Sequence, residues 1–180
     1  MTSDRDRTPD TVIVLAMHGM PPRDFPPREA AEFFSLHARP PHGGPDDVIL
    51  QRRKAFLEAK MREWPRTAEN DPFHAGSYAL AAHLSQAAGA PVVVGFNEFC
   101  APSLDEAFDR AAASGARRVL VMTPMMTRGG EHSEVDIPEA VRRAKERHPG
   151  ISFHYVWPFD PAAVADFLAA QITSSATRSD

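Results

Sequence analysis

The chain has 180 residues, of which 43% are hydrophobic and 24% are charged, and its net charge is −4. This composition is typical of one soluble globular domain. No apolar run approaches the roughly 20 residues of a membrane-spanning helix, and the polar amino terminus does not resemble a secretion signal. We therefore expect a cytoplasmic protein without membrane contact. The negative charge argues against nucleic-acid binding, which requires a basic patch, and the single cysteine, Cys100, excludes an internal disulfide.

The first half of the chain begins with a strand and continues into a proline-rich segment. Residues 11–17 form an unbroken β-branched and aliphatic run, which is typical of a strand buried on both faces. Residues 20–75 are too long for a simple crossover and are predicted to hold helices at 28–36 and 47–64, the second ended by Pro65. The apolar stripe of this second helix contains Ile49, Leu50, Phe56, Leu57, Met61 and Trp64. We interpret residues 20–75 as an insertion, a lid or an oligomer contact.

Helices and strands alternate regularly in the second half of the chain. Further strands are predicted at 91–96, 117–123 and 151–157, and further helices at 77–88, 104–114, 136–148 and 159–172. Ser103 and Glu106 form a capping box at one helix start, and Asp136 is placed to cap another. Alternating strands and helices imply right-handed crossovers and a parallel sheet covered on both faces. We therefore predict an α/β fold with an open parallel four-stranded sheet flanked by helices and a helical, proline-rich insertion after the first strand.

The same pattern predicts the domain boundaries. A single domain should span residues 11–172, and residues 1–10 and 173–180 should be flexible tails.

Three of the strand-like runs end near a residue that can bind a metal. His18 follows the first strand, Glu98 follows VVVGFN, and His132 lies in the loop after RVLVMTPMM. The carboxyl ends of parallel strands open into one crevice, so these side chains can converge. Two imidazoles and a carboxylate suit zinc, iron, cobalt or nickel, and three protein ligands leave positions open for a substrate. The sequence has no HExxH helix, CxxC pair or phosphate-binding glycine loop.

Each of these residues also has a purely structural interpretation. His18 alone can be a hydrogen-bonded core histidine, and His132 alone can be a surface histidine in a glycine-containing loop. Glu98 needs a partner at the end of a buried strand, because carboxylates are rarely buried unpaired. The combination of the three residues, rather than any one of them, points to a metal site.

Three segments of the chain, taken in order, form a distinctive set: the His-Gly pair after the first strand, FNEFCAPSLDEAF, and GGEHSEVDIPEAVRRAKERHPG. Together they resemble the class II tetrapyrrole chelatases. The resemblance covers about residues 11–19 and 89–172 and points to the CbiX and SirB group, which inserts a metal into sirohydrochlorin. It implies an open parallel sheet, a homodimer, and His18, Glu98 and His132 as the metal-binding and catalytic residues. A divalent cobalt, iron or nickel ion would then be a substrate, and no organic cofactor is needed.

The resemblance also suggests residues that bind the tetrapyrrole. Sirohydrochlorin carries carboxylates, which favour arginines and helix amino termini near the pocket. Arg128 lies on the loop before His132, and Ser103 begins a helix at the same edge of the sheet, so both are candidates. Met20 could form a soft wall against a large flat ligand. Cys100 could reach the metal if the chain stays extended after Glu98, and a buried, inert thiol is the alternative.

The leading hypothesis is a chelatase in which the two histidines bind the metal and accept protons, with Glu98 as their carboxylate partner. The chain departs from the family in Met20, in Cys100 and in the long separation between His18 and Glu98. These departures motivate an alternative, a protein of the same fold that carries a metal or a metallated tetrapyrrole without catalysing insertion. A third interpretation is a structural α/β protein in which the three residues never meet.

Overall fold

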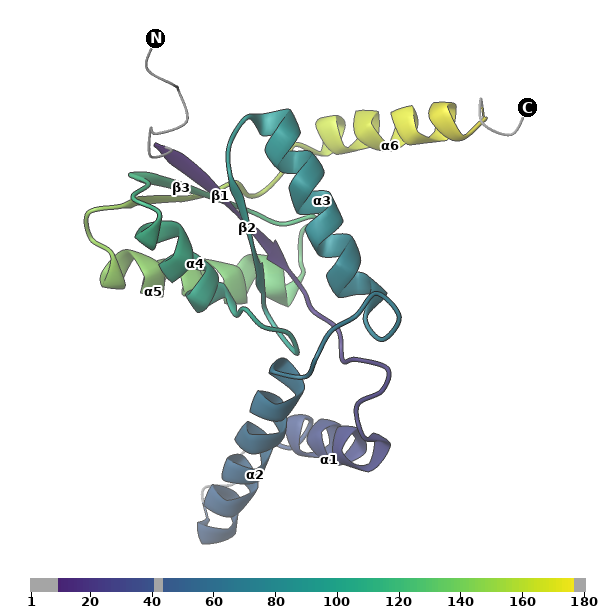
Figure 1. Ribbon diagram of the computed structural model, residues 1–180, viewed down its shortest axis with the longest axis vertical. Coiled ribbons are helices and arrows are strands. Elements are labelled where there is room, and N and C mark those ends of the chain that lie inside the picture. The colour runs from purple at the N-terminus through teal and green to yellow at the C-terminus, as the bar shows by residue number, and fades with distance from the viewer. Residues whose placement is uncertain (1–9, 41–43, 177–180) are drawn as a thin grey trace.

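The fold is built around one four-stranded sheet (Figure 1). The computed structural model describes residues 10–40 and 44–176. The strands are β1 (Thr11–Met17), β2 (Val92–Phe96), β3 (Arg118–Met122) and β4 (Ser152–Tyr155). The helices are α1 (Pro27–His37), α2 (Pro45–Arg62), α3 (Pro72–Ala88), α4 (Leu104–Ala113), the π-helical turn η2 (His132–Asp136), α5 (Ile137–Arg147) and α6 (Pro161–Ala176).

All four strands pair in parallel, in the order β2-β1-β3-β4, which confirms the predicted open parallel sheet. Met17 at the end of β1 pairs with Phe96 at the end of β2. On the other side of β1, Leu15 pairs with Met122, the last residue of β3. The three strands therefore end at the same edge, and the chain segments that leave them emerge close together.

The two faces of the sheet carry separate cores. On one face, Val12 and Val14 of β1 pack with residues of α4 and α5 such as Phe108 and Ile137. On the opposite face, β1 and β2 pack with α3 and with the segment between β1 and α3. The buried residues of this second core are Leu15, Met17, Phe25, Phe33, Leu57, Met61, Ala81, Val94, Phe96, Phe99 and Cys100. β1 is thus covered on both sides, as its unbroken apolar run predicts.

The inserted helices α1 and α2 project beyond the carboxyl edge of the sheet (Figure 1). Two ion pairs join them, from Lys60 to Glu29 and from Arg53 to Glu32, both at 2.7 Å. The end of α2 nearest the sheet reaches the second core, where Leu57 and Met61 are fully buried. Residues 20–75 therefore contribute part of the hydrophobic core.

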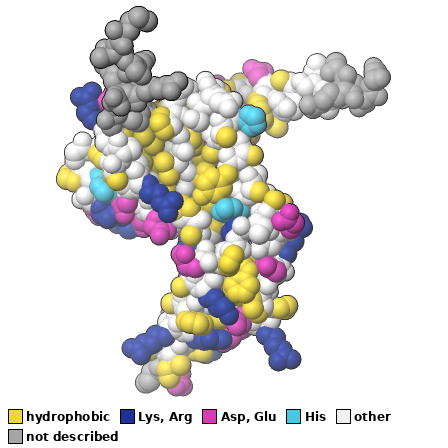
Figure 2. Space-filling view, viewed as in Figure 1, with side chains coloured by type: hydrophobic (Ala, Val, Ile, Leu, Met, Phe, Trp, Pro, Cys, Tyr) yellow, Lys and Arg dark blue, Asp and Glu magenta, His cyan; other side chains and the backbone are white. Residues whose placement is uncertain are grey.

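The predicted apolar stripe of α2 is wrong at two of its residues. Ile49 and Phe56 are 67% and 57% exposed. The reason is that most of α2 lies beyond the sheet, with α1 as its neighbour (Figure 1). Figure 2 accordingly shows hydrophobic side chains exposed on the projecting helices, among Lys and Arg side chains.

Several boundaries differ from the prediction. α3 begins at Pro72, five residues before the predicted start at residue 77, because Asp71 caps it by accepting the N–H of His74 at 2.9 Å. α6 continues to Ala176, so residues 173–176 of the predicted tail are helical, and residues 177–180 lie outside the described residues. The carbonyl of Asp10 accepts the N–H groups of Arg117 and Arg118, so Asp10 is held against the start of β3, whereas the rest of the predicted tail, residues 1–9, lies outside the described residues. Within the described residues, none of the helices is long and apolar enough to cross a membrane.

Candidate metal centre

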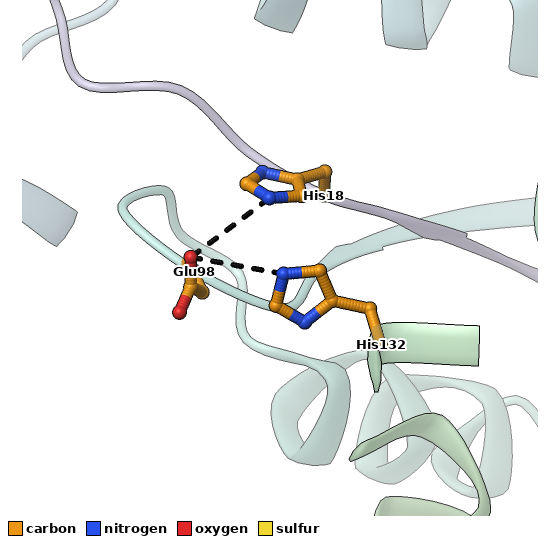
Figure 3. A group of neighbouring side chains, drawn as sticks. All are labelled: His18, Glu98 and His132. Carbon is orange, nitrogen blue, oxygen red and sulfur yellow. Dashed lines mark ion pairs between the residues drawn. The ribbon is translucent and has the colours of Figure 1, made fainter. Parts of the chain in front are cut away.

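His18, Glu98 and His132 lie together at the carboxyl edge of the sheet (Figure 3). Nε2 of His18 and Nε2 of His132 each lie 4.0 Å from Oε2 of Glu98. One ligand atom from each residue lies within 4.8 Å of the others. Two ligands of one zinc-type ion, each about 2.1 Å from it, are at most about 4.2 Å apart. Small side-chain rotations would therefore allow all three residues to contact one ion.

The ring of His18 is oriented by the backbone of the next residue, Gly19. Nδ1 lies 2.6 Å from the carbonyl oxygen of Gly19, so Nδ1–H can donate to that oxygen and leave the lone pair of Nε2 toward Glu98. Gly19 adopts a φ of +98°, and a Cβ atom there would lie 1.9 Å from the carbonyl oxygen of Glu98. The absence of a side chain at Gly19 is therefore what allows the segments after β1 and β2 to approach each other.

Glu98 is held against the His18 segment by main-chain hydrogen bonds. The N–H groups of Asn97 and Glu98 donate to the carbonyls of Met17 and His18, both at 2.9 Å. The parallel pairing of β1 and β2 thus continues beyond the strands to the ligand residues. Phe99 then has a φ of +60°, a left-handed conformation that bulky residues rarely adopt, and the chain turns sharply away.

This turn directs Cys100 away from the candidate metal position. Its thiol is fully buried, and Sγ lies 3.4 Å from the carbonyl of Met20 and 3.6 Å from Oδ2 of Asp71. Burial raises the pKa of the Cys100 thiol, which keeps it protonated. The structure therefore favours the buried, inert thiol over a metal ligand.

His132 is oriented by a carboxylate in its own turn. Nδ1 lies 2.6 Å from Oδ2 of Asp136, so Nδ1–H can donate to the carboxylate while Nε2 faces Glu98. Nδ2 of Asn97 lies 2.6 Å from the same Nδ1 and 3.3 Å from Oδ2 of Asp136. Such a carboxylate partner fixes the tautomer and direction of a metal-binding imidazole.

The predicted capping role of Asp136 is wrong. Its backbone is helical, with φ −67° and ψ −46°, and its side chain makes no cap hydrogen bond. The reason is that η2 runs directly into α5, so the helical backbone begins at His132 and not at Asp136. The carboxylate is thereby free to bond the ring of His132.

The three predicted tetrapyrrole-binding residues have different surroundings. Met20 is 46% exposed, two residues after His18. The side chain of Arg128 is 72% exposed and pairs with Glu134 at 3.3 Å. Ser103 forms the predicted capping box, since its N–H donates to the Glu106 carboxylate and its hydroxyl accepts the N–H of Glu106.

A cavity of about 380 Å³ lies next to Glu98 and Ser103. Arg62 and Arg143 line it, although the sequence does not single them out as site residues. Both already have partners, Arg62 in the carbonyl of Cys100 and Arg143 in the carboxylate of Asp105. Their positions depend on tertiary packing, so no local motif identifies them. Asp136 was detectable from its spacing, because it lies four residues after a candidate metal-binding histidine.

An open parallel sheet with two imidazoles and a carboxylate at its carboxyl edge defines an α/β protein with a candidate metal centre. Residues 69–175, more than half of the chain, match the CbiX family. The chain therefore belongs to the CbiX family, which confirms the resemblance found in the sequence. The matched segment contains Glu98 and His132. His18 lies outside this segment in sequence, but the fold places it beside them.

Two curated proteins of Priestia megaterium are similar over shorter stretches. A sirohydrochlorin cobaltochelatase is 38% identical over 63 residues, which are 35% of this chain and 20% of the relative. A sirohydrochlorin ferrochelatase is 28% identical over 81 residues, which are 44% of this chain and 30% of the relative. The chain thus matches less than a third of the length of either relative.

A solved structure supports the fold. It is that of a CbiX protein from Marinobacter aquaeolei VT8, named for cobalamin (vitamin B12) biosynthesis. It is similar with a TM-score of 0.53 at 14% identity, covering 94% of this chain and 99% of that one. At this identity the similarity concerns the arrangement of the chain alone.

Proposed function

We propose that this protein inserts a divalent metal ion into sirohydrochlorin or a related tetrapyrrole. The observation that carries the proposal is the convergence of His18, Glu98 and His132 at a solvent-open position in a chain of the CbiX family. Their side chains are 38%, 28% and 23% exposed, so both an ion and a macrocycle can approach. Cobalt, iron and nickel all accept imidazole and carboxylate ligands, and the named relatives support cobalt and iron.

Metal insertion exchanges two pyrrole N–H protons for one divalent ion, so the site must handle both a cation and protons. The Nε2 atoms of His18 and His132 can bind the ion and, once it has passed to the macrocycle nitrogens, accept the protons. Glu98 lies between them and offsets the positive charge that the site carries. Asp136 stabilises His132 when its ring is bound to metal or protonated, because the carboxylate accepts from Nδ1–H.

Exposed apolar side chains next to the triad support a flat substrate. Phe99 lies 6.1 Å from the ring of His18, and Phe34 of α1 lies 5.9 Å from Phe99, as measured between ring centroids. Phe34 is 42% exposed and Met20 is 46% exposed. We propose that these two side chains contact one face of the macrocycle, while Arg128 binds its carboxylates. Ser103 remains a candidate for substrate binding only because it lines the neighbouring cavity, since its N–H already donates to Glu106.

The test is insertion of Co²⁺, Fe²⁺ and Ni²⁺ into sirohydrochlorin, followed by absorbance. We expect His18→Ala and His132→Ala each to reduce the rate by at least about 100-fold, the lower end for loss of an acid-base group. His83→Ala is the matched control, because His83 is exposed on α3. A wild-type rate equal to the uncatalysed rate for every metal would refute the proposal. Tight binding of the metallated product without turnover would identify a carrier instead.

Pairing of two chains stays a prediction, supported by α6. Its residues Phe167, Leu168 and Ile172 are 49%, 51% and 71% exposed, and α6 extends away from the sheet (Figure 1). Sedimentation velocity of the wild type and of Leu168→Glu with Ile172→Glu would measure the assembly. A wild-type protein that stays monomeric at all concentrations would exclude the homodimer.

A further inference from the structure

Arg66 and Asp71 form a buried ion pair beside the candidate metal centre. Their side chains are 6% and 1% exposed, and Nη1 of Arg66 lies 2.5 Å from Oδ2 of Asp71. Burying two charges is costly unless both are fully hydrogen-bonded. The stability of this pair therefore depends on the other hydrogen bonds that the two side chains make.

The guanidinium of Arg66 uses all five of its N–H groups. Nη1 also donates to the carbonyl of Met20 at 2.7 Å, and Nη2 donates to the carbonyls of Met61 at 2.8 Å and Phe99 at 2.5 Å. Nε donates to the carbonyl of Trp64 at 3.2 Å. Arginine has five donors in a fixed planar fork, so this side chain has no free donor left.

Two of these carbonyls belong to the turns that carry metal-binding residues. Met20 lies two residues after His18, and Phe99 directly follows Glu98. The φ of Phe99 is +60°, and its strained conformation needs surrounding interactions to persist. Arg66 supplies one of these interactions. Through the same guanidinium it also holds the turn after His18 at a fixed distance from the turn after Glu98.

Asp71 completes the connection to the rest of the fold. Its Oδ1 caps α3 by accepting the N–H of His74, while its Oδ2 accepts from Arg66 and from the thiol of Cys100. The ion pair therefore joins the end of α2, the start of α3 and the two ligand-bearing turns. His132 is outside this network and is oriented separately by Asp136.

We propose that Arg66 is a positioning residue of the metal centre, which sets the separation between His18 and Glu98. The inference rests on the proposed metal centre, but not on catalysis of insertion. Lysine could replace the charge but not the planar fork, because its three donors on one nitrogen cannot reach carbonyls in three different segments with the same geometry. Arg66 acts through these carbonyls and would not touch the ion.

The experiment compares Co²⁺ binding by calorimetry and the visible absorption of bound Co²⁺ in full-length variants. The decisive variant is Arg66→Met combined with Asp71→Asn. It leaves no unpaired buried charge, and the asparagine oxygen can still cap α3. We expect the Co²⁺ dissociation constant to rise at least about 10-fold, as for other outer partners of metal ligands, and the absorption bands to shift. The control is Arg147→Met, which breaks a different ion-pair cluster, between α5 and α4.

Both measurements are made well below the melting temperature of each variant, so a loss of stability alone does not change them. A dissociation constant and spectrum equal to the wild type would overturn the proposal and leave Arg66 a structural residue. If the double variant does not fold, Arg66→Lys decides, since the proposal requires weaker Co²⁺ binding there too. A wild type that binds Co²⁺ but inserts none of Co²⁺, Fe²⁺ and Ni²⁺ would refute the proposed function and leave this inference standing. A wild type that binds none of these three ions would refute both.

Discussion

Gly19→Ala tests the contact that holds the two ligand-bearing turns together. The added Cβ would lie 1.9 Å from the carbonyl oxygen of Glu98, about 1.1 Å inside the 3.0 Å limit below which real Cβ contacts are essentially absent. The neighbouring atom is main chain, so it cannot rotate away as a flexible side chain would. Either the turn after His18 or the turn after Phe96 must move by about 1 Å.

The expected loss of stability combines two effects. Alanine at a φ of +98° is strained, which costs about 1–3 kcal/mol, and the displacement disturbs the N–H bond from Glu98 to the carbonyl of His18. A total of about 3 kcal/mol is at the upper end of ordinary single substitutions. For a chain of this size it lowers the melting temperature by about 6–12 °C. A shift of about 1 Å also exceeds the roughly 0.5 Å tolerance of a preorganised site, so Co²⁺ affinity should fall.

Variants at two other glycines distinguish the effect of backbone strain from the effect of steric overlap. Gly89 has a φ of +64° with nothing within 4 Å of an added Cβ, and Gly76 lies inside α3 in open space. Gly89→Ala should cost about 1–2 kcal/mol from strain alone, and Gly76→Ala should stabilise the protein by up to about 1 kcal/mol. Thermal unfolding and Co²⁺ calorimetry of the three variants give the comparison. If Gly19→Ala is no more destabilising than Gly89→Ala and binds Co²⁺ normally, the close approach has no importance for the site.

Three further predictions concern single side chains. Asp136→Asn should weaken Co²⁺ binding about 10–100-fold in calorimetry. The melting temperature should change little, since the Asp136 side chain is 42% exposed. Unchanged Co²⁺ affinity would mean that His132 needs no carboxylate partner. Ser103→Ala should lower the free energy of unfolding by about 1 kcal/mol, as measured by thermal unfolding, because the cap is lost. The KM for the tetrapyrrole should stay unchanged, and a raised KM at unchanged stability would assign Ser103 to substrate binding. Cys100, buried and with a raised pKa, should react with a thiol reagent only after denaturation, and rapid reaction of the native protein would contradict its burial.

The sheet was predictable because β1, β2 and β3 consist mainly of apolar residues in unbroken runs and the turns have local signals. The capping box of Ser103 and Glu106 is one such signal, and the structure has it as predicted. The convergence of His18, Glu98 and His132 could be expected from topology alone, because parallel strands end at a common edge. Each of these predictions depends on residues that are close in sequence or on a general rule of sheet geometry.

The features that the sequence does not reveal depend on contacts between distant segments. Arg66 in WPRTAEND has no motif, because most of its partners are main-chain carbonyls, and a carbonyl has no sequence signature. Ile49 and Phe56 follow a helical apolar pattern but are exposed, since periodicity does not state where the sheet ends. Asp136 before Ile-Pro has the sequence of a cap, and only the extension of the helix back to His132 gives its carboxylate another partner.

The π-helical turn also predicts how the length of this region can vary among relatives. Ile137 donates its N–H to the carbonyl of His132, which closes a wider turn than an α-helix has. Removing one residue between them would restore α-helical spacing and rotate His132 by about 100° around the helix axis, away from Glu98. Insertions and deletions should therefore occur in the loop before His132, around Gly129, and be absent between His132 and Ile137. An alignment of functional relatives can thus be read for conserved spacing as well as for conserved residues.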